Sequence, residues 1–200
     1  MAAIENVRRH TRDDVARTAL QILDEYGLPD LTMRRLAAAL DVQPSALYWH
    51  FPNKQTLLAE LADRIVAPVG REHEEPDATP GARDAAAALR DALLTYRDGA
   101  EVVSTTLALG LGSSAARDGL AAAIIADGFD ADIAGRAATA LLHFVLGHVS
   151  HEQQRMQYDS IGVVTPDASM SKQGHDDPTT DFAFGVDLLV GGLELSRSRA

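Results

Sequence analysis

Apolar residues recur at the spacing of an α-helix along most of this 200-residue chain. The clearest segment runs from 11 to 26, where the apolar positions repeat so that all of them fall on one face of a helix. Those positions are Val15, Ala19, Ile22, Leu23 and Tyr26. Aromatic residues make up only 5% of the chain, and alanine and leucine supply most of its apolar residues, which favours helices over sheets. We therefore predict an all-α fold.

Turn-forming residues divide the pattern into further helices. The first four are predicted to begin at Thr11, Thr32, Pro44 and Lys54, and the fourth to end before Pro68. Helices are also predicted over 82–97, 114–126 and 131–157, with a last one from Asp181. Residues 70–81 are expected to be a linker and 158–179 a loop, while 101–113 (EVVSTTLALGLGS) is ambiguous. Three glycines in the last helix, Gly185, Gly191 and Gly192, predict close packing against another helix.

Composition narrows the class of protein. The chain has no cysteine, which excludes a disulfide framework and a thiolate metal site. The N-terminus has no apolar core of a signal peptide, and no run of 18 apolar residues follows. We expect a cytoplasmic protein with no membrane contact.

The net charge of −11 is unevenly distributed. Residues 1–70 hold eight Lys and Arg against nine Asp and Glu, so ten basic and twenty acidic residues fall in 71–200. Such an asymmetry suggests two different tasks along the chain. We expect one domain over 1–67 and a second over 68–200.

Residues 42–54, VQPSALYWHFPNK, gather three polar-tipped rings on one predicted helix. A helix, a short turn and a second helix form a helix-turn-helix arrangement, in which Leu47 and Phe51 would face inward. Tyr48, Trp49 and His50 would then face outward, against a polyanion. The alternative is that Tyr48 and Trp49 are core or interface aromatics.

At these residues the chain resembles the tetracycline-repressor (TetR) family. LTMRRLAAALDVQPSALYWHFPNKQTLLAEL, over 31–61, is similar to the DNA-binding head of that family, and TYRDGAEV, LLHFVLGHV and FGVDLLVGGLE resemble its tetracycline-repressor branch. The resemblance implies a three-helix head and a helical core that dimerises through a four-helix bundle. It also implies that a small-molecule effector in the core releases the homodimer from a double-stranded DNA operator.

The resemblance also implies which residues contact DNA. They are Thr32, Met33, Arg34, Pro44, Ser45, Ala46, Tyr48, Trp49, His50 and Lys54. Asp41 stands where the family has a turn glycine, and aspartate tolerates the left-handed conformation better than most residues. Proline and alanine have no side-chain donor, so direct reading of bases is expected to rest on Arg34, Ser45 and methyl contacts.

Two observations give the candidate effector residues: the positions that match the family's drug site, and one face of a predicted helix that carries two histidines. The residues are Ala85, Leu89, Val103, Thr106, Leu120, His143, Gly147 and His151. The magnesium-anchoring histidine of that site is replaced by Val103, and a glutamate by His151. Magnesium prefers oxygen ligands, so we expect no metal and no cofactor. The more apolar site favours an aromatic or polyketide-like compound over magnesium-tetracycline. His151 could instead be simply solvated.

Other functions remain open at this point. A TetR-like activator or a ligand-independent DNA-binding dimer would have the same sequence features. Gly110-x-Gly112-x-x-Ala115 after a strand-like segment weakly suggests a dinucleotide-binding enzyme. His148-x-x-His151 has the spacing of a metal pair, but it lacks a third strong ligand beyond Glu152.

Overall fold

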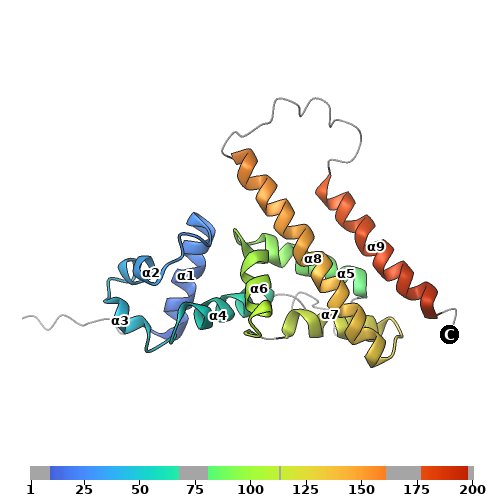
Figure 1. Ribbon diagram of the computed structural model, residues 1–200, viewed down its shortest axis with the longest axis horizontal. Coiled ribbons are helices and arrows are strands. Elements are labelled where there is room, and N and C mark those ends of the chain that lie inside the picture. The colour runs from blue at the N-terminus through green and yellow to red at the C-terminus, as the bar shows by residue number, and fades with distance from the viewer. Residues whose placement is uncertain (1–9, 68–80, 113, 161–176, 198–200) are drawn as a thin grey trace, which may run out of the picture.

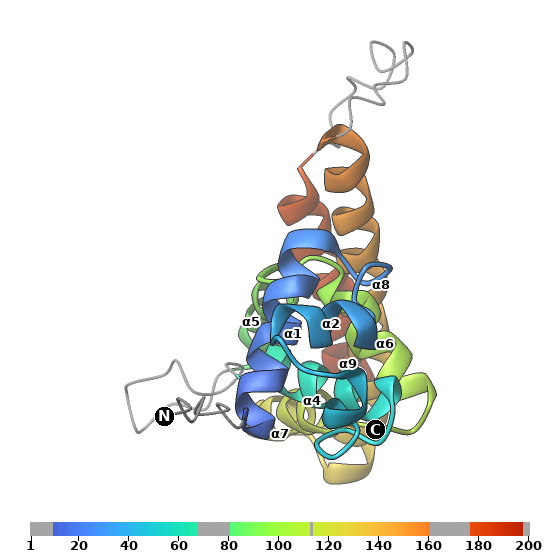
Figure 2. The same ribbon diagram turned by 90° about the vertical axis from the view of Figure 1, so that its left-hand side faces the viewer.

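The computed structural model describes residues 10–67, 81–112, 114–160 and 177–197. Within those ranges every regular element is an α-helix, which confirms the predicted all-α fold. In chain order the helices are α1 (Arg12–Tyr26), α2 (Met33–Ala39), α3 (Pro44–Leu47), α4 (Lys54–Val66), α5 (Ala82–Leu94), α6 (Gly99–Ala108), α7 (Ala115–Ala126), α8 (Ala131–Ser160) and α9 (Pro178–Arg197). Helices α1–α4 form a head at one end, and α5–α9 form a core in which the long α8 packs beside α9 (Figure 1). Viewed from the head, α1–α4 lie in front of that core (Figure 2).

Local capping sets where the head helices begin. The Thr11 hydroxyl accepts the Asp14 N–H, and the Asp14 carboxylate accepts the Thr11 N–H, which is a reciprocal capping box. The Thr32 hydroxyl accepts the Arg35 N–H at 3.1 Å. Pro44 stands at the first position of α3, where its missing N–H costs nothing. The helix starts predicted at Thr11, Thr32 and Pro44 are confirmed.

The structure corrects several predicted elements of the core. The ambiguous segment after 100 forms most of α6. Its residues Val102, Val103 and Thr106 are buried on the face that packs against the core. Because these residues recur at helical spacing, the β-branched composition did not produce a strand. Helix α5 ends at Leu94 and α8 continues to Ser160. Most of the expected linker over 70–81 and loop over 158–179 lies outside the described residues.

The head has an apolar core of its own. Its largest fully buried side chains are Leu23, Leu31, Leu36, Leu47, Phe51, Leu57, Leu61 and Ile65. Tyr26, which the periodicity assigned to the same face, is 40% exposed instead. It lies at the rim, where the Arg35 guanidinium stacks 3.7 Å from the centre of its ring.

Ion pairs join the two long helices of the head. Arg12 and Arg64, from α1 and α4, both bind the Glu60 carboxylate at 2.9 Å, and Arg64 also binds Asp13 at 2.7 Å. Hydrogen bonds from Arg64 and from Arg17 hold the pKa of Asp13 below its usual range. Burial tends to raise the pKa of Glu60, but hydrogen bonds from Arg64 and Arg12 outweigh it and lower that pKa. These carboxylates therefore stay charged and engaged within the head.

The head meets the core at Asp98, which precedes α6. The Asp98 carboxylate accepts the Leu28 N–H at 2.8 Å, directly after α1, and also accepts a hydrogen bond from the Gln157 amide of α8. Gly27 has a positive φ of 83°, and a Cβ there would lie 2.8 Å from the Asp98 carboxylate, so a side chain would force that carboxylate to shift. Asp98 lies within TYRDGAEV, but no local pattern in the sequence indicates this contact with the head.

The core helices α5, α8 and α9 are held by one buried ion pair. Arg90 binds Glu152 through two hydrogen bonds, of 2.6 and 3.1 Å, and donates a third to Thr179 at 3.3 Å. Nearby, a Cβ at Gly185 would lie 2.2 Å from Phe144 Cζ, so α9 can approach α8 closely at this glycine. That confirms the close packing predicted for Gly185. The space beside Gly191 and Gly192 is open. Apart from their chain neighbours and the backbone of their own helix, no atom lies within 4 Å of the position that a Cβ would take.

Replacing Arg90 with methionine tests the buried pair. Arg90→Met should lower the free energy of unfolding by about 3–5 kcal/mol, because Glu152 is left charged and buried without a partner. Urea denaturation at fixed protein concentration measures the change.

The matched control is Arg83→Met on the same helix. Arg83 pairs with Asp187 and Glu194, but all three side chains are well exposed. Such pairs contribute about 0–1 kcal/mol. Equal losses in the two variants would contradict a special role for the buried pair.

Candidate nucleic-acid interface and ligand site

The turn between α2 and α3 has the predicted geometry. Asp41 adopts the left-handed conformation, with φ of 55°, and the Val42 N–H donates to the Ala37 carbonyl at 3.0 Å. Leu47 and Phe51 are then buried, as predicted. The aspartate in place of a turn glycine therefore closes the helix-turn-helix.

Helix α3 is shorter than predicted. Its regular turns end at Leu47, and the three rings follow in a hydrogen-bonded turn, where His50 N–H and Phe51 N–H both donate to the Leu47 carbonyl at 2.9 Å. Trp49 is 90% exposed and Tyr48 49% exposed, while His50 is half-buried. The two largest rings are thus outside the core of the head.

The basic side chains of the head fall into two groups, those that form ion pairs and those that do not. Arg12, Arg17, Arg35 and Arg64 all form ion pairs with acidic residues of the head. Arg34, exposed on α2, and Lys54, the half-buried first residue of α4, have no ion pair to any described residue. Their charges remain available to an anion outside the chain.

The other predicted contact residues are placed less uniformly. Pro44 and Ser45 are exposed at the start of α3, and Ala46 is half-buried. Thr32 is exposed, with its hydroxyl in the cap of α2. Met33 is half-buried and packs against the apolar core, so it shows only part of its surface.

Gln43 directly precedes α3, and its exposed side chain makes no capping hydrogen bond. Glutamine is not a preferred residue before the first turn of a helix.

In the core, five of the predicted effector residues share one buried interior. Ala85 and Leu89 lie on α5, Val103 and Thr106 on α6, and Leu120 on α7, and all are at most 5% exposed. The Thr106 hydroxyl lies within hydrogen-bond distance of its own helix, 2.9 Å from Val103 O and 3.1 Å from Val102 O. This interior is therefore mainly apolar.

The other three predicted effector residues lie elsewhere. His143, Gly147 and His151 share one face of α8, as their spacing predicted, but that face is exposed in the single chain. The structure does not bring them to the five buried positions. His148 turns inward instead, with Nε2 3.1 Å from the Pro178 carbonyl oxygen and its ring against Phe182.

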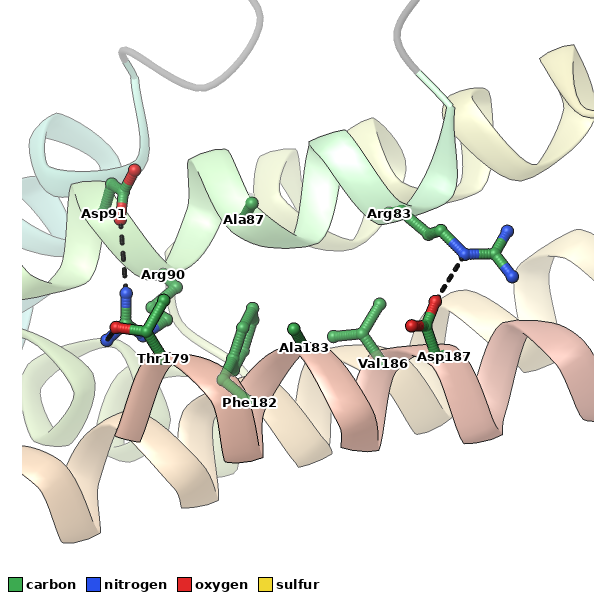
Figure 3. A pocket seen from close by; sticks show the side chains of 9 residues that line it. All are labelled: Arg83, Ala87, Arg90, Asp91, Thr179, Phe182, Ala183, Val186 and Asp187. Carbon is green, nitrogen blue, oxygen red and sulfur yellow. Dashed lines mark hydrogen bonds and ion pairs between the residues drawn. The ribbon is translucent and has the colours of Figure 1, made fainter. Parts of the chain in front are cut away.

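A groove of about 370 Å³ lies between α5 and α9 (Figure 3). Phe182 and Val186 form its apolar floor. Arg83 bonded to Asp187 marks one end, and Arg90 beside Asp91 the other. None of the predicted effector residues lines this groove.

The alternative sites find little support. Gly110 and Gly112 follow helix α6 and not a strand, so the context of a dinucleotide-binding loop is missing. In the described ranges no three His, Asp or Glu side chains are grouped so that they could hold a metal ion. No helix among the described residues is long and apolar enough to cross a membrane.

Two family models match the chain. The model for bacterial regulatory proteins of the tetR family matches residues 16–61, and the model for the tetracyclin repressor-like C-terminal domain matches 80–197. A curated relative, tetracycline repressor protein class C of Escherichia coli, is 35% identical over 203 residues, which cover 93% of this chain and 91% of the relative.

Several solved structures are similar to this chain in both fold and sequence. Mycobacterium smegmatis BioQ is 39% identical with a TM-score of 0.77, covering 92% of this chain and 97% of that one. BioQ bound to its natural double-stranded DNA operator is 37% identical with a TM-score of 0.71, over 92% and 98%. A TetR variant from Acinetobacter baumannii AYE in complex with minocycline is 31% identical with a TM-score of 0.71, over 94% and 98%.

Proposed function

The chain belongs to the tetR family of bacterial regulatory proteins, and on that premise we propose a ligand-responsive repressor that leaves its operator when it binds a hydrophobic or aromatic molecule. The two family matches together extend over most of the chain, so the protein is a DNA-binding regulator and not an enzyme. Residues 1–67 bind DNA, and 68–200 bind the effector and dimerise. A cytoplasmic location follows from the need to reach DNA.

The observation that carries the DNA interface is the exposure of Trp49 and Tyr48 on a head where two cations, Arg34 and Lys54, pair with no described residue. Tyr48 and His50 donate hydrogen bonds to phosphates, and Trp49 packs against sugar or methyl groups. Arg34 and Lys54 bind the backbone on either side. BioQ, a relative of similar fold, was solved with its double-stranded DNA operator, which supports DNA binding by this chain.

Two copies of the chain complete the repressor. One face of α9 exposes Phe184, Leu188 and Leu195, each more than 60% exposed, with Gly191 and Gly192 between them. These residues recur at helical spacing, and an apolar stripe of this kind favours burial against another helix. We propose that it pairs with α8 and α9 of a second copy in a four-helix bundle, placing two α3 helices about 34–36 Å apart in successive major grooves.

The effector enters the apolar interior of the core. Thr106 is the only polar side chain among the five buried positions proposed to line the site, which favours an aromatic or polyketide-like compound. His143 and His151 lie on an exposed face of α8, and we propose that they reach the ligand from the dimer interface. The minocycline complex of a relative supports a polycyclic ligand class. Since Val103 and His151 replace the metal-binding residues, magnesium is not required.

Release from DNA requires that the ligand favours one arrangement of the core over another. Helix α4 packs along α6, and Asp98 ties the end of α1 to α6 and α8. A change at Val103 or Thr106 of α6 therefore reaches both connections to the head.

Lys54→Ala should weaken binding to all DNA sequences alike. Removing one phosphate contact lowers the slope of log K against log salt by about 0.9, so the slope for a dimer should fall by about two units. Titration of a fluorescent duplex between low and moderate salt measures the slope. Arg17→Ala is the control, since Arg17 is exposed but already paired with Asp13; an unchanged slope in the lysine variant would remove Lys54 from the interface.

Leu188→Glu should convert the dimer to a monomer and abolish operator binding, because charge is placed in the apolar stripe. Light scattering after size-exclusion chromatography gives the mass. Ile125→Glu, at a 48% exposed position on α7, should leave the dimer intact. A Leu188 variant that remains dimeric would show that the two copies meet through another face.

Gel-shift binding to DNA from upstream of the protein's own gene tests the whole proposal. A specific complex should form with this DNA. An aromatic polyketide should release it, whereas tetracycline added together with magnesium should not. A complex that no compound releases would argue for a ligand-independent regulator, and release only by magnesium-tetracycline would overturn the proposed ligand class.

A further inference from the structure

We propose that the groove between α5 and α9 is a second small-molecule site, separate from the apolar interior, and that its ligand is a flat aromatic cation. The two sites lie on opposite faces of α5. Ala87 lines the groove, whereas Ala85 and Leu89 are buried in the interior. Each of them is two residues from Ala87, which is about 200° around a helix. Binding in the groove therefore requires neither the interior site nor DNA.

The groove has the size of a small-molecule site. Its volume is about 370 Å³, and such sites commonly enclose about 300–1,000 Å³. Small side chains leave this space open, because Ala87 of α5 and Ala183 of α9 both line it and both are exposed (Figure 3). Arg83 and Arg90 mark its two ends, and the helix between them rises by about 10 Å. These dimensions suit a molecule of a few fused rings.

The floor of the groove is apolar and held in place. Phe182 and Val186 form it, and both are at most 4% exposed. The Phe182 ring stacks on Phe144 with 5.8 Å between the ring centres, and the His148 ring meets it edge-on at 5.3 Å. A floor that is already packed in this way loses little freedom when a flat ring lies on it.

The arginines at the two ends are not available to an anionic ligand. Arg90 makes two hydrogen bonds to Glu152, of 2.6 and 3.1 Å. Arg83 binds Asp187 at 2.7 Å and Glu194 at 3.0 Å. An anion in the groove would have to displace one of these carboxylates, so the presence of two arginines does not favour it.

The charge that remains in the groove is negative. Two arginines and the four carboxylates that contact them leave a local net charge of −2; the carboxylates are Asp91, Glu152, Asp187 and Glu194. Asp91 is the one best placed to bind a cation. Its side chain is 75% exposed, and its contact with Arg90 is long, at 3.6 Å. The ligand therefore carries a positive charge beside Asp91 and an apolar ring over Phe182.

The proposed dimer leaves the groove open. The apolar stripe that would meet the second copy includes Phe184 and Leu188, whereas the groove is lined by Phe182 and Val186. Members of each pair lie two residues apart, so the stripe and the groove are on different sides of α9. A ligand can reach the groove in either the monomer or the dimer.

The experiment is isothermal titration of the full-length protein, without DNA, with three compounds that share one ring system. They are 9-aminoacridine, which is a cation at neutral pH, neutral acridine, and anionic acridine-9-carboxylate. The cation should bind once per chain. Acridine should bind about two- to fivefold more weakly, since an exposed ion pair contributes this much, and the anion should bind more weakly than acridine.

A groove-filling variant tests the place of binding. Ala87→Leu combined with Ala183→Leu should weaken binding of 9-aminoacridine by about tenfold or more, because the added side chains occupy the space of the rings. Ala122→Leu combined with Ala126→Leu, at two exposed positions of α7, is the matched control and should bind as wild type does.

A charge variant tests the chemical class. Asp91→Asn should weaken binding of the cation by about two- to fivefold and leave the affinity for acridine unchanged. Asp159→Asn, at an exposed position of α8, changes the net charge equally and should have no effect. Circular dichroism checks that each variant is folded, and Asp91→Asn alone decides if the paired leucines prevent folding.

Three outcomes overturn the proposal. If 9-aminoacridine binds the groove-filling and Asp91 variants as tightly as wild type, it lies in the interior or elsewhere. If the three compounds bind equally, or the anion binds best, the ligand class is wrong. If none of them binds, the groove is not a ligand site. Operator binding is measured separately, so each of these failures leaves the proposed regulator function standing.

Discussion

The Asp98 carboxylate is the interaction on which the arrangement of head and core depends. It accepts one hydrogen bond from the backbone just after α1 and another from α8. Asp98 itself holds a left-handed conformation, with φ of 57°. Gly99 beside it lets the chain pass Leu93, because a Cβ there would lie 2.3 Å from the Leu93 carbonyl oxygen. A charged acceptor in this nearly buried place makes stronger hydrogen bonds than a neutral one. Together with the packing of α4 on α6, it ties the proposed DNA-binding head to the helices of the core.

That position explains how two distant sites can affect each other. The five buried positions proposed for the effector lie on α5, α6 and α7, and the exposed rings lie after α3. The packing of α4 on α6 and the Asp98 hydrogen bonds connect these two regions. Since packed helices shift as units, a ligand that moves α6 changes both connections together. The head can then change its orientation without any change inside its own core.

The same structure resolves how a chain with a net charge of −11 can approach DNA. Several acidic residues of the head are not free to repel phosphates, because Asp13, Glu60 and Asp30 are held by arginines. Arg34 and Lys54, which pair with no described residue, are then the charges that this surface offers outward. Most of the negative charge belongs to the core, which lies farther from the proposed interface and whose repulsion is screened by salt.

Features set by neighbouring residues could be read from the sequence, and features set by distant contacts could not. Side chains only a few positions apart determine the helix starts at Thr11, Thr32 and Pro44. The same is true of the left-handed Asp41 and of the inward positions of Leu47 and Phe51. The conformation after 100 was ambiguous because β-branched residues suit both a strand and a packed helix, and only contact with α4 and α8 decided it. In the same way, the spacing of His143 and His151 predicted that they share one face of α8. It could not predict which face of that helix the core would bury. The local sequence therefore accounts for most of the helix positions and for the helix-turn-helix. The joint at Asp98 and the ion pairs of Arg12 and Arg64 required the tertiary structure, because each depends on groups brought together from distant parts of the chain.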